Sequence, residues 1–179
     1  MSDKIKKSYK QSKNIYDDVL TQSKWWSRLY IRLFWNGVDD KEIAQKVLEY
    51  IPYDFSGKLL DVPVGTAVFT FDKYASLKNA DITCLDYSED MLEQANKKFK
   101  KAKIANIATI QGDVGALPFS DRSFDIVLSM NGFHAFPDKN KAYAEISRVL
   151  KQNGKFIACF YVQGESKITD LLVKCILAK

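Results

Sequence analysis

The stretch from Lys58 to Phe69 constrains the fold most, because it has the pattern of a buried strand followed by a tight turn and the start of a helix. A second apolar run closes on Asp86, about 20 positions after the turn glycine Gly65, which is the offset typical of nucleotide-binding βαβ units. In such units the turn presents backbone N–H groups to a cofactor, and the carboxylate accepts hydrogen bonds from two ribose hydroxyls. The central question is therefore which adenosine-containing cofactor this unit selects.

The chain of 179 residues contains 46% apolar residues, which is enough for one globular domain with a complete core. It has no uncharged apolar run close to the roughly 18 residues that span a bilayer, and residues 1–7 lack the apolar segment of a signal peptide. The three cysteines form no CxxC or Cys/His cluster, so we expect neither a metal site nor a disulfide. These features predict a cytoplasmic protein without a membrane span.

The net charge of +5 comes largely from two lysine clusters. One lies at the N-terminus, at Lys4, Lys6, Lys7, Lys10 and Lys13, and the other lies between Lys97 and Lys103. Basic segments of this kind either bind RNA or an acidic membrane surface, or form a solvated tail and the exposed end of a helix. The aromatic residue within the second cluster, Phe99, is expected on the apolar face of its helix with Leu92 and Ala95, rather than exposed for base stacking, so the solvated interpretation is favoured.

Strand and helix patterns alternate along the chain after Pro52. We expect strands at 58–64, 81–87, 107–111, 124–130 and 156–162, and helices at 66–77, from Ser88 to about residue 102, and at 138–150. An earlier helix begins at a capping pair, Asp39 and Glu42, and Asn153-Gly154 is expected to form a turn before the last strand. The strands are almost continuous apolar runs, as in a parallel sheet covered by helices on both faces. The sequence therefore predicts a doubly wound, Rossmann-like α/β domain whose ligand lies beyond the carboxyl ends of the strands.

The N-terminal segment has a separate, aromatic character. Apolar and aromatic side chains recur at helical spacing at Trp26, Leu29, Tyr30 and Leu33. Gly37 is placed to end that helix, which is either a lid over the cofactor and acceptor or a part of the core. We divide the chain accordingly into residues 1–38, a basic arm with an aromatic helical lid, and residues 39–179, the cofactor-binding domain.

The turn after the first strand argues against a dinucleotide. A GxGxxG turn would have glycines where this sequence has Pro63, Gly65 and Val68. Asp61 precedes the turn, and its carboxylate would repel a pyrophosphate but attract a cationic ligand such as S-adenosylmethionine, which carries an ammonium and a sulfonium. Asp113, at the end of the third strand, is placed to accept the exocyclic N–H of adenine.

Five segments in a characteristic order give the chain a resemblance to a known family. They are Leu59–Ala67, a glycine-rich first motif; Leu85–Leu92, a ribose-binding second strand; Gly112–Phe119, an adenine-contacting segment; Phe124–Met130, a fourth strand; and Arg148–Lys155, which leads into the fifth. Over roughly residues 40–162 the sequence resembles the class I S-adenosylmethionine-dependent methyltransferases, especially the small-molecule branch related to ubiquinone and menaquinone biosynthesis enzymes.

The resemblance implies a cofactor site built from the loops that follow four strands. The methionine moiety would be surrounded by Asp61, Pro63, Gly65 and Thr66, and the ribose hydroxyls would be held by Asp86. The adenine would be contacted by Tyr87 and Met91, and its edge by Asp113 and Val114. The reacting end would be approached by the backbone of Met130 or Asn131. Two positions, Pro63 and Ala67, are commonly glycine in the family. Alanine at position 67 is therefore expected to avoid a positive φ.

The implied reaction is methyl transfer from a sulfonium to a small organic acceptor by in-line displacement, which needs orientation and a dry pocket but no nucleophilic side chain. His134, the sole histidine, follows the fourth strand and is either a general base for an acceptor that must lose a proton or a residue of the pocket wall. Asn131–His134 is not the motif with which family members methylate adenine or amide nitrogens, which disfavours a nucleic-acid acceptor. The alternatives are an RNA or protein methyltransferase recruited by the basic arm, and a non-catalytic S-adenosylmethionine-binding protein.

The sequence after Val162 has room for one apolar-faced helix, over 168–178, but not for two further strands of ordinary length. Members of the family usually have seven strands, so we expect a five-stranded sheet in the order 3-2-1-4-5 that lacks strands 6 and 7. The fifth strand would then lie at an open edge, which favours pairing with a second copy in a homodimer.

Overall fold

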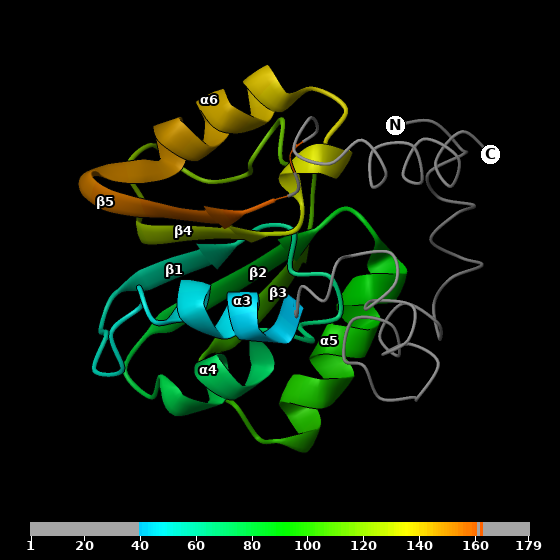
Figure 1. Ribbon diagram of the computed structural model, residues 1–179, viewed down its shortest axis with the longest axis vertical. Coiled ribbons are helices and arrows are strands. Elements are labelled where there is room, and N and C mark those ends of the chain that lie inside the picture. Colours follow the sequence, from blue (N-terminus) through cyan, green and yellow to red (C-terminus); the bar gives the residue numbers. More distant parts are fainter. Residues whose placement is uncertain (1–39, 161, 163–179) are drawn as a thin grey trace. The chain divides into compact units, whose positions relative to one another are not determined.

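The computed structural model describes residues 40–160 and 162. The chain divides into two units, residues 44–160 and residues 1–43 with 161–179, and the sheet belongs to the first of them. Its strands are β1 (Lys58–Asp61), β2 (Asp81–Asp86), β3 (Ile107–Gln111), β4 (Phe124–Met130) and β5 (Leu150–Cys159). All neighbouring strands are parallel, in the order β3-β2-β1-β4-β5 (Figure 1). The predicted α/β fold and strand order are confirmed.

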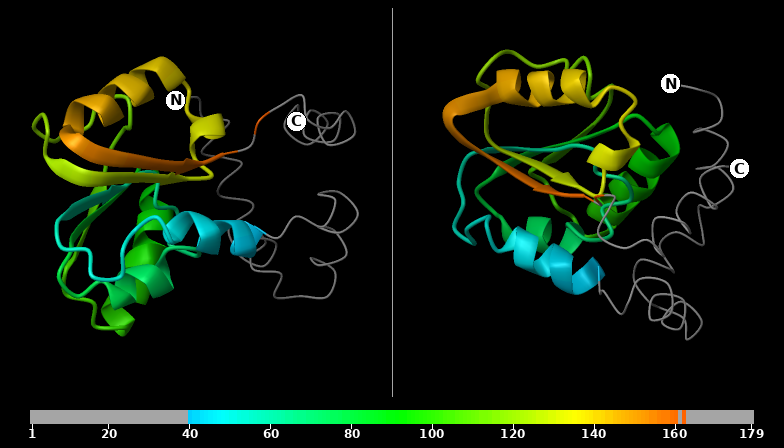
Figure 2. Two further views of the ribbon diagram at one scale, coloured as in Figure 1. Left: turned by 60° about the vertical axis from the view of Figure 1, so that its left-hand side comes forward. Right: turned by 45° about the horizontal axis from the view of Figure 1, so that its top comes forward.

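Helices cover both faces of this sheet (Figure 2). The helical elements are α3 (Asp40–Leu48), α4 (Phe71–Ser76), α5 (Glu89–Lys101), the 3₁₀-helix η1 (Phe133–Ala135) and α6 (Lys139–Val149). One core, which includes Leu59, lies under α4, α5 and the part of α3 within this unit, and the other, which includes Leu60, lies under α6. Successive side chains of β1 thus enter opposite cores, because the side chains of a strand alternate between its faces. The alternation explains why the strands are apolar along their whole length.

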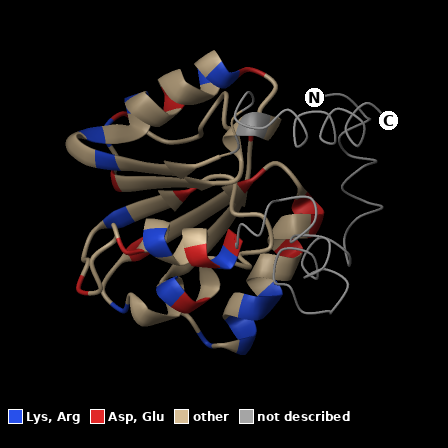
Figure 3. Ribbon diagram, viewed as in Figure 1, with Lys and Arg blue, Asp and Glu red and all other residues tan. Residues whose placement is uncertain are grey.

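Helix α5 follows the sequence prediction closely. The hydroxyl of Ser88 accepts a hydrogen bond from the Met91 N–H at 3.4 Å, as an N-cap does. Acidic residues occupy its first turn and lysines its last turn (Figure 3), which is the arrangement that the helix dipole favours. Lys97 pairs with Glu93 at 2.7 Å, and Lys98 Nζ donates to the carbonyl of Thr66 at 3.0 Å. These internal contacts account for two lysines of the second basic cluster.

The segment between β1 and α4 differs from the prediction. The strand ends at Asp61, three residues earlier than expected, and the helix begins at Phe71 rather than at Thr66. The cause is a series of turns in which Gly65 and Ala67 both have φ of +56°. The expectation that Ala67 avoids a positive φ was therefore wrong: the residue is almost fully buried, and its neighbours hold it in the left-handed region.

The start of β5 also differs. A strand was expected from Phe156, after a turn at Asn153-Gly154, but β5 begins at Leu150 and contains both of these residues. Phe124 pairs with Leu150, and Ile126, two residues on, pairs with Lys155, so the extra residues bulge from the ladder. A Cβ at Gly154 would lie only 3.0 Å from the Asp125 carbonyl, so glycine allows this close approach of the two strands.

Several predictions concern residues outside the described part of the chain. They are the basic arm and aromatic helix within residues 1–38, the Asp39 cap, and the helix expected over 168–178. Within residues 40–160, no helix has the length and apolar character that a membrane span requires.

Candidate functional site

The carboxyl ends of β1, β2, β3 and β4 bring the predicted site residues to one edge of the sheet. Asp61 ends β1, Asp86 ends β2, and Met130 ends β4, while Asp113 follows β3 by two residues. In the register, Asp61 aligns with Cys84, two residues before the end of β2, and Asp86 aligns with Gln111, the last residue of β3. The three strands therefore end close together. Ligands of doubly wound sheets bind at this edge.

Asp86 is directly joined to the glycine turn, as the spacing of the two motifs indicates. One carboxylate oxygen accepts the N–H of Gly65 at 2.8 Å, and the other accepts the N–H of Ser88 at 2.8 Å. Burial raises the pKa of this carboxyl, and these backbone N–H groups oppose the rise. A carboxylate has about four lone-pair positions, so acceptor capacity is left for further hydroxyl donors.

Asp61 is a buried acid with one unmatched oxygen. Its side chain is 1% exposed, Oδ2 accepts the hydroxyl of Tyr74 at 2.7 Å, and Oδ1 has no hydrogen-bond partner among the described residues. Burial raises its pKa to about 7; the hydroxyls of Tyr74 and Thr70 oppose this rise, and the charge of Asp86 adds to it. Tyr74 could not be identified from the sequence, because it lies in α4 and nothing in the local pattern indicates that its hydroxyl meets β1.

The turn from Pro63 to Thr66 lies between these two acids. A Cβ added at Gly65 would meet nothing within 4 Å, so the turn faces open space there. Thr66 is buried, and its carbonyl accepts a hydrogen bond from Lys98 of α5. Gly132 was not identified from the sequence, yet a Cβ at that position would collide with the ring of Pro63. A proline in the first motif and a glycine after β4 therefore fit together sterically.

The loop after β3 carries Asp113 and Val114. Asp113 is exposed, its Oδ1 accepts the N–H of Gly115 at 2.8 Å, and Val114 is buried. The loop begins next to the Asp86 strand end, since Gly112 N–H donates to the Asp86 carbonyl at 3.0 Å. On the same side, the amide of Gln111 donates to the carbonyl of Tyr87 at 3.1 Å. Met91, in the first turn of α5, is 3% exposed.

After β4 the backbone turns sharply. Met130 is buried, and Asn131 has φ of +52°, a conformation that asparagine tolerates better than most residues. The N–H of Asn131 still donates to Cys159 of β5 at 2.7 Å, which holds the turn against the sheet. His134 lies in η1, two residues further on than Gly132, and the role of its side chain stays a prediction. No cluster of three or more metal-ligating side chains occurs among residues 40–160.

A family model described as a methyltransferase domain matches residues 60–158, more than half of the chain and the whole of the strand edge described above. The chain belongs to this methyltransferase family. The match confirms the resemblance to methyltransferases that was inferred from the motifs.

Individual relatives agree with this assignment. The chain is 40% identical over 106 residues to the demethylmenaquinone methyltransferase of Lactococcus lactis, a match that covers 58% of this chain and 42% of that protein. The crystal structure of the YcgJ protein of Bacillus subtilis has a TM-score of 0.65 at 26% identity over 75% of this chain and 56% of YcgJ. A S-adenosylmethionine-dependent methyltransferase from Aquifex aeolicus shares the fold, with a TM-score of 0.62 at 19% identity over 75% of this chain and 77% of that one. The chain thus spans about half the length of the curated relatives it matches.

Proposed function

We propose that this chain acts as a S-adenosylmethionine-dependent methyltransferase that transfers a methyl group to a small organic acceptor by direct in-line displacement. The observation that carries the proposal is the set of carboxylates of Asp61, Asp86 and Asp113, which follow three adjacent strands around an open glycine turn. The negative charge of these carboxylates is suited to a cationic adenosyl ligand and unsuited to a pyrophosphate.

The residues present fit the cofactor. Asp61 Oδ1 is a buried acceptor without a partner among the described residues, and the ammonium of the methionine moiety would supply the missing donor. Asp86 would accept the ribose hydroxyls, and Asp113 with Val114 would meet the adenine edge, with Tyr87 and Met91 against its ring. Pro63, Gly65 and Thr66 would line the methionine side, and the backbone of Met130 or Asn131 would lie at the reacting end.

The work left to the protein is binding and orientation. When bound, the cofactor supplies an electrophilic methyl carbon on a positively charged sulfur. Asp86 would hold the adenosyl end and Asp61 the methionine end from two sides of the turn, which would orient the cofactor for the acceptor. His134 would act as a general base only for an acceptor that must lose a proton.

An apolar acceptor is supported by the aromatic side chains around η1. The ring of Phe133 lies 5.2 Å from that of Phe136 and 5.6 Å from that of Phe160, measured between centroids. Phe160 is 46% exposed, so the group offers an aromatic surface close to the turn after β4. Relatives named demethylmenaquinone methyltransferase support a small organic acceptor.

The proposal includes three features that concern the whole protein. Residues 1–38 would provide an aromatic lid, the protein would work in the cytoplasm, and the edge strand β5 would favour a homodimer. Each follows from the sequence argument above, and a nucleic-acid acceptor is disfavoured by the same argument.

The test combines binding with turnover. Calorimetry should show tighter binding of S-adenosylhomocysteine than of NAD; preferential binding of NAD would overturn the cofactor. Transfer of a labelled methyl group should then be measured on hydroxylated aromatic compounds, total RNA and protein extract. Labelling of RNA or protein alone would favour the basic-arm alternative, and tight binding without transfer to any acceptor would favour a non-catalytic binding protein.

A further inference from the structure

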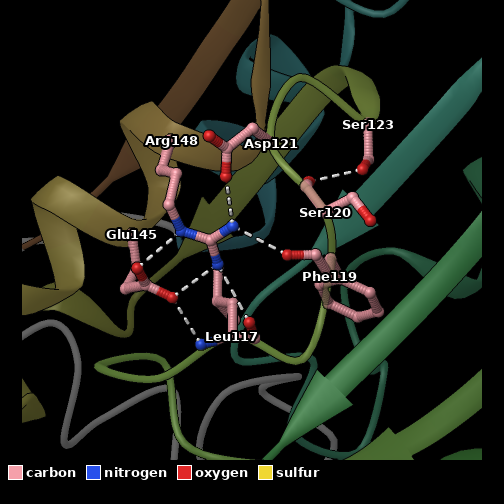
Figure 4. A network of polar contacts seen from close by, with 7 residues as sticks. All are labelled: Leu117, Phe119, Ser120, Asp121, Ser123, Glu145 and Arg148. Carbon is pink, nitrogen blue, oxygen red and sulfur yellow. Dashed lines mark hydrogen bonds and ion pairs between the residues drawn. The ribbon is translucent and has the colours of Figure 1, made fainter.

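Arg148, near the C-terminal end of α6, uses all five of its N–H donors within the described residues (Figure 4). Nε and Nη2 donate to the two oxygens of Glu145 at 2.7 and 2.8 Å, and Nη1 donates to Asp121 at 2.8 Å. The other two bonds go to backbone carbonyls, from Nη1 to Phe119 at 2.7 Å and from Nη2 to Leu117 at 3.0 Å. One side chain therefore connects α6 to three residues of the loop between β3 and β4.

Glu145 extends this connection to a second backbone group. Its Oε2 accepts the N–H of Leu117 at 2.7 Å, so the Arg148–Glu145 pair holds both the N–H and the carbonyl of one loop residue. The hydrogen bond from Arg148 lowers the pKa of Glu145, which keeps the acceptor ionised. A lysine could not reproduce the arrangement, because it lacks the planar fork that reaches a carboxylate and two carbonyls together.

The clamped residue lies next to the turn that carries Asp113. Within that turn, Ala116 N–H donates to the Asp113 carbonyl at 3.0 Å, and Gly115 N–H donates to the Asp113 side chain at 2.8 Å. The other end of the loop is tied to the Asp86 carbonyl by Gly112. The loop that carries Asp113 is therefore held at both ends, to β2 through Gly112 and to α6 through Leu117.

We propose that Arg148 is a positioning residue for adenine recognition, which acts through the loop from Gly112 to Leu117 to place Asp113 and Val114 against the adenine edge. The inference rests on the proposed function, because it takes that edge to be read by these two residues. It assigns to the fifth motif, which begins at Arg148, a role in selecting the base rather than only in leading into β5.

The test measures base preference rather than affinity alone. Binding of S-adenosylhomocysteine is compared by calorimetry with binding of S-inosylhomocysteine, in which an oxygen replaces the exocyclic amine that Asp113 would accept. We expect the wild-type chain to prefer the adenine ligand by about tenfold or more, since the inosine ligand leaves the carboxylate without its donor. Arg148→Lys should reduce this preference at least about threefold, and in an Asp113→Ala background it should no longer change the preference.

The matched control is Lys151→Met. It removes the ion pair between Lys151 of β5 and Asp125 of β4, which lies near the start of these two strands, and it should keep the wild-type preference. If Arg148→Lys does not fold, Glu145→Gln provides the test. Glutamine keeps the shape of the side chain, but it has no charge and only one acceptor oxygen for Arg148 and Leu117. An unchanged preference in that variant overturns the proposal. A folded Arg148→Lys that weakens both ligands equally, or neither, also overturns it. Absence of S-adenosylhomocysteine binding by the wild type would instead refute the proposed function and the inference with it.

Discussion

The carboxyl end of β1 and the Arg148 cluster, in which Arg148 contacts Glu145, Asp121, Phe119 and Leu117, differ in how their polar groups are paired. At the first, Asp61 Oδ1 is buried without a hydrogen-bond partner among the described residues. At the second, every donor of Arg148 is matched by an acceptor of the chain itself. Buried polar atoms are nearly always paired in folded proteins, so the unpaired oxygen of Asp61 is consistent with the proposed ligand, whereas the fully paired Arg148 is consistent with a structural role in holding the loop.

Asp86→Ala should have the largest effect on the ligand side of this comparison. The variant removes the acceptor for two ribose hydroxyls and for the Gly65 N–H, so we expect the affinity for S-adenosylhomocysteine to fall at least about 100-fold by calorimetry. Asp81→Ala is the matched control, because it removes an exposed carboxylate from the opposite end of β2 and should leave the affinity unchanged. Equal affinities in the two variants would contradict the ribose assignment.

Asp61 should make both stability and binding depend on pH. With its pKa raised from 3.8 to about 7, the folded chain holds a proton that the unfolded chain releases between these values, so stability of the ligand-free protein should fall as the pH rises from about 4 to about 7. Affinity for the cationic ligand should rise over the same range, since the ligand favours the ionised carboxylate.

Asp61→Asn tests this assignment. The variant should raise the free energy of unfolding at pH 8 by about 1–3 kcal/mol in urea titrations, and it should weaken binding by about tenfold or more and remove its pH dependence below neutrality. Tyr74→Phe keeps the acid but removes the hydroxyl that opposes the rise in its pKa, so the pH dependence should move to higher pH. Binding that is independent of pH in the wild type would argue against a charge interaction at Asp61.

Gly132→Ala should have an intermediate effect, because it tests the steric fit between the turn after β4 and Pro63. The added methyl group collides with the proline ring, so we expect unfolding in urea to become easier by about 1–3 kcal/mol. Gly115→Ala serves as the comparison, since its nearest neighbour would be 3.4 Å away, and its effect should be clearly smaller. If the two alanine variants were equally stable, the two loops would not be coupled.

Asp121→Asn should have the smallest effect, and it tests how much the ion pair between Asp121 and Arg148 contributes to stability. Asp121 is 73% exposed, and its ion pair with Arg148 is largely screened by solvent. We expect the midpoint of thermal unfolding to stay within error of the wild type at low and at high salt. A large, salt-sensitive decrease would mean that the exposed end of the Arg148 cluster contributes to stability as well as to loop position.

Local patterns predicted the elements well where one physical rule decides them. The bounds of β3 and β4 follow from apolar runs, and the start of α5 follows from Ser88, whose side chain accepts a backbone N–H of the first helical turn. Predictions failed where distant segments decide the backbone. Ala67 is held at a positive φ by its buried surroundings, and Asn153-Gly154 stays in β5 because β4 pairs on both sides of it.

By itself the sequence determined the family, the strand order and the three acids of the strand ends, because motif spacing and the geometry of parallel sheets bring those positions together wherever the loops lie. Only the tertiary structure decided which groups each of these acids contacts. It joined Tyr74 to Asp61, set Gly132 against Pro63 and brought Arg148 to Leu117. These contacts join residues on separate elements, and hydrogen bonding and packing at such range depend on the folded positions of both partners rather than on any local pattern.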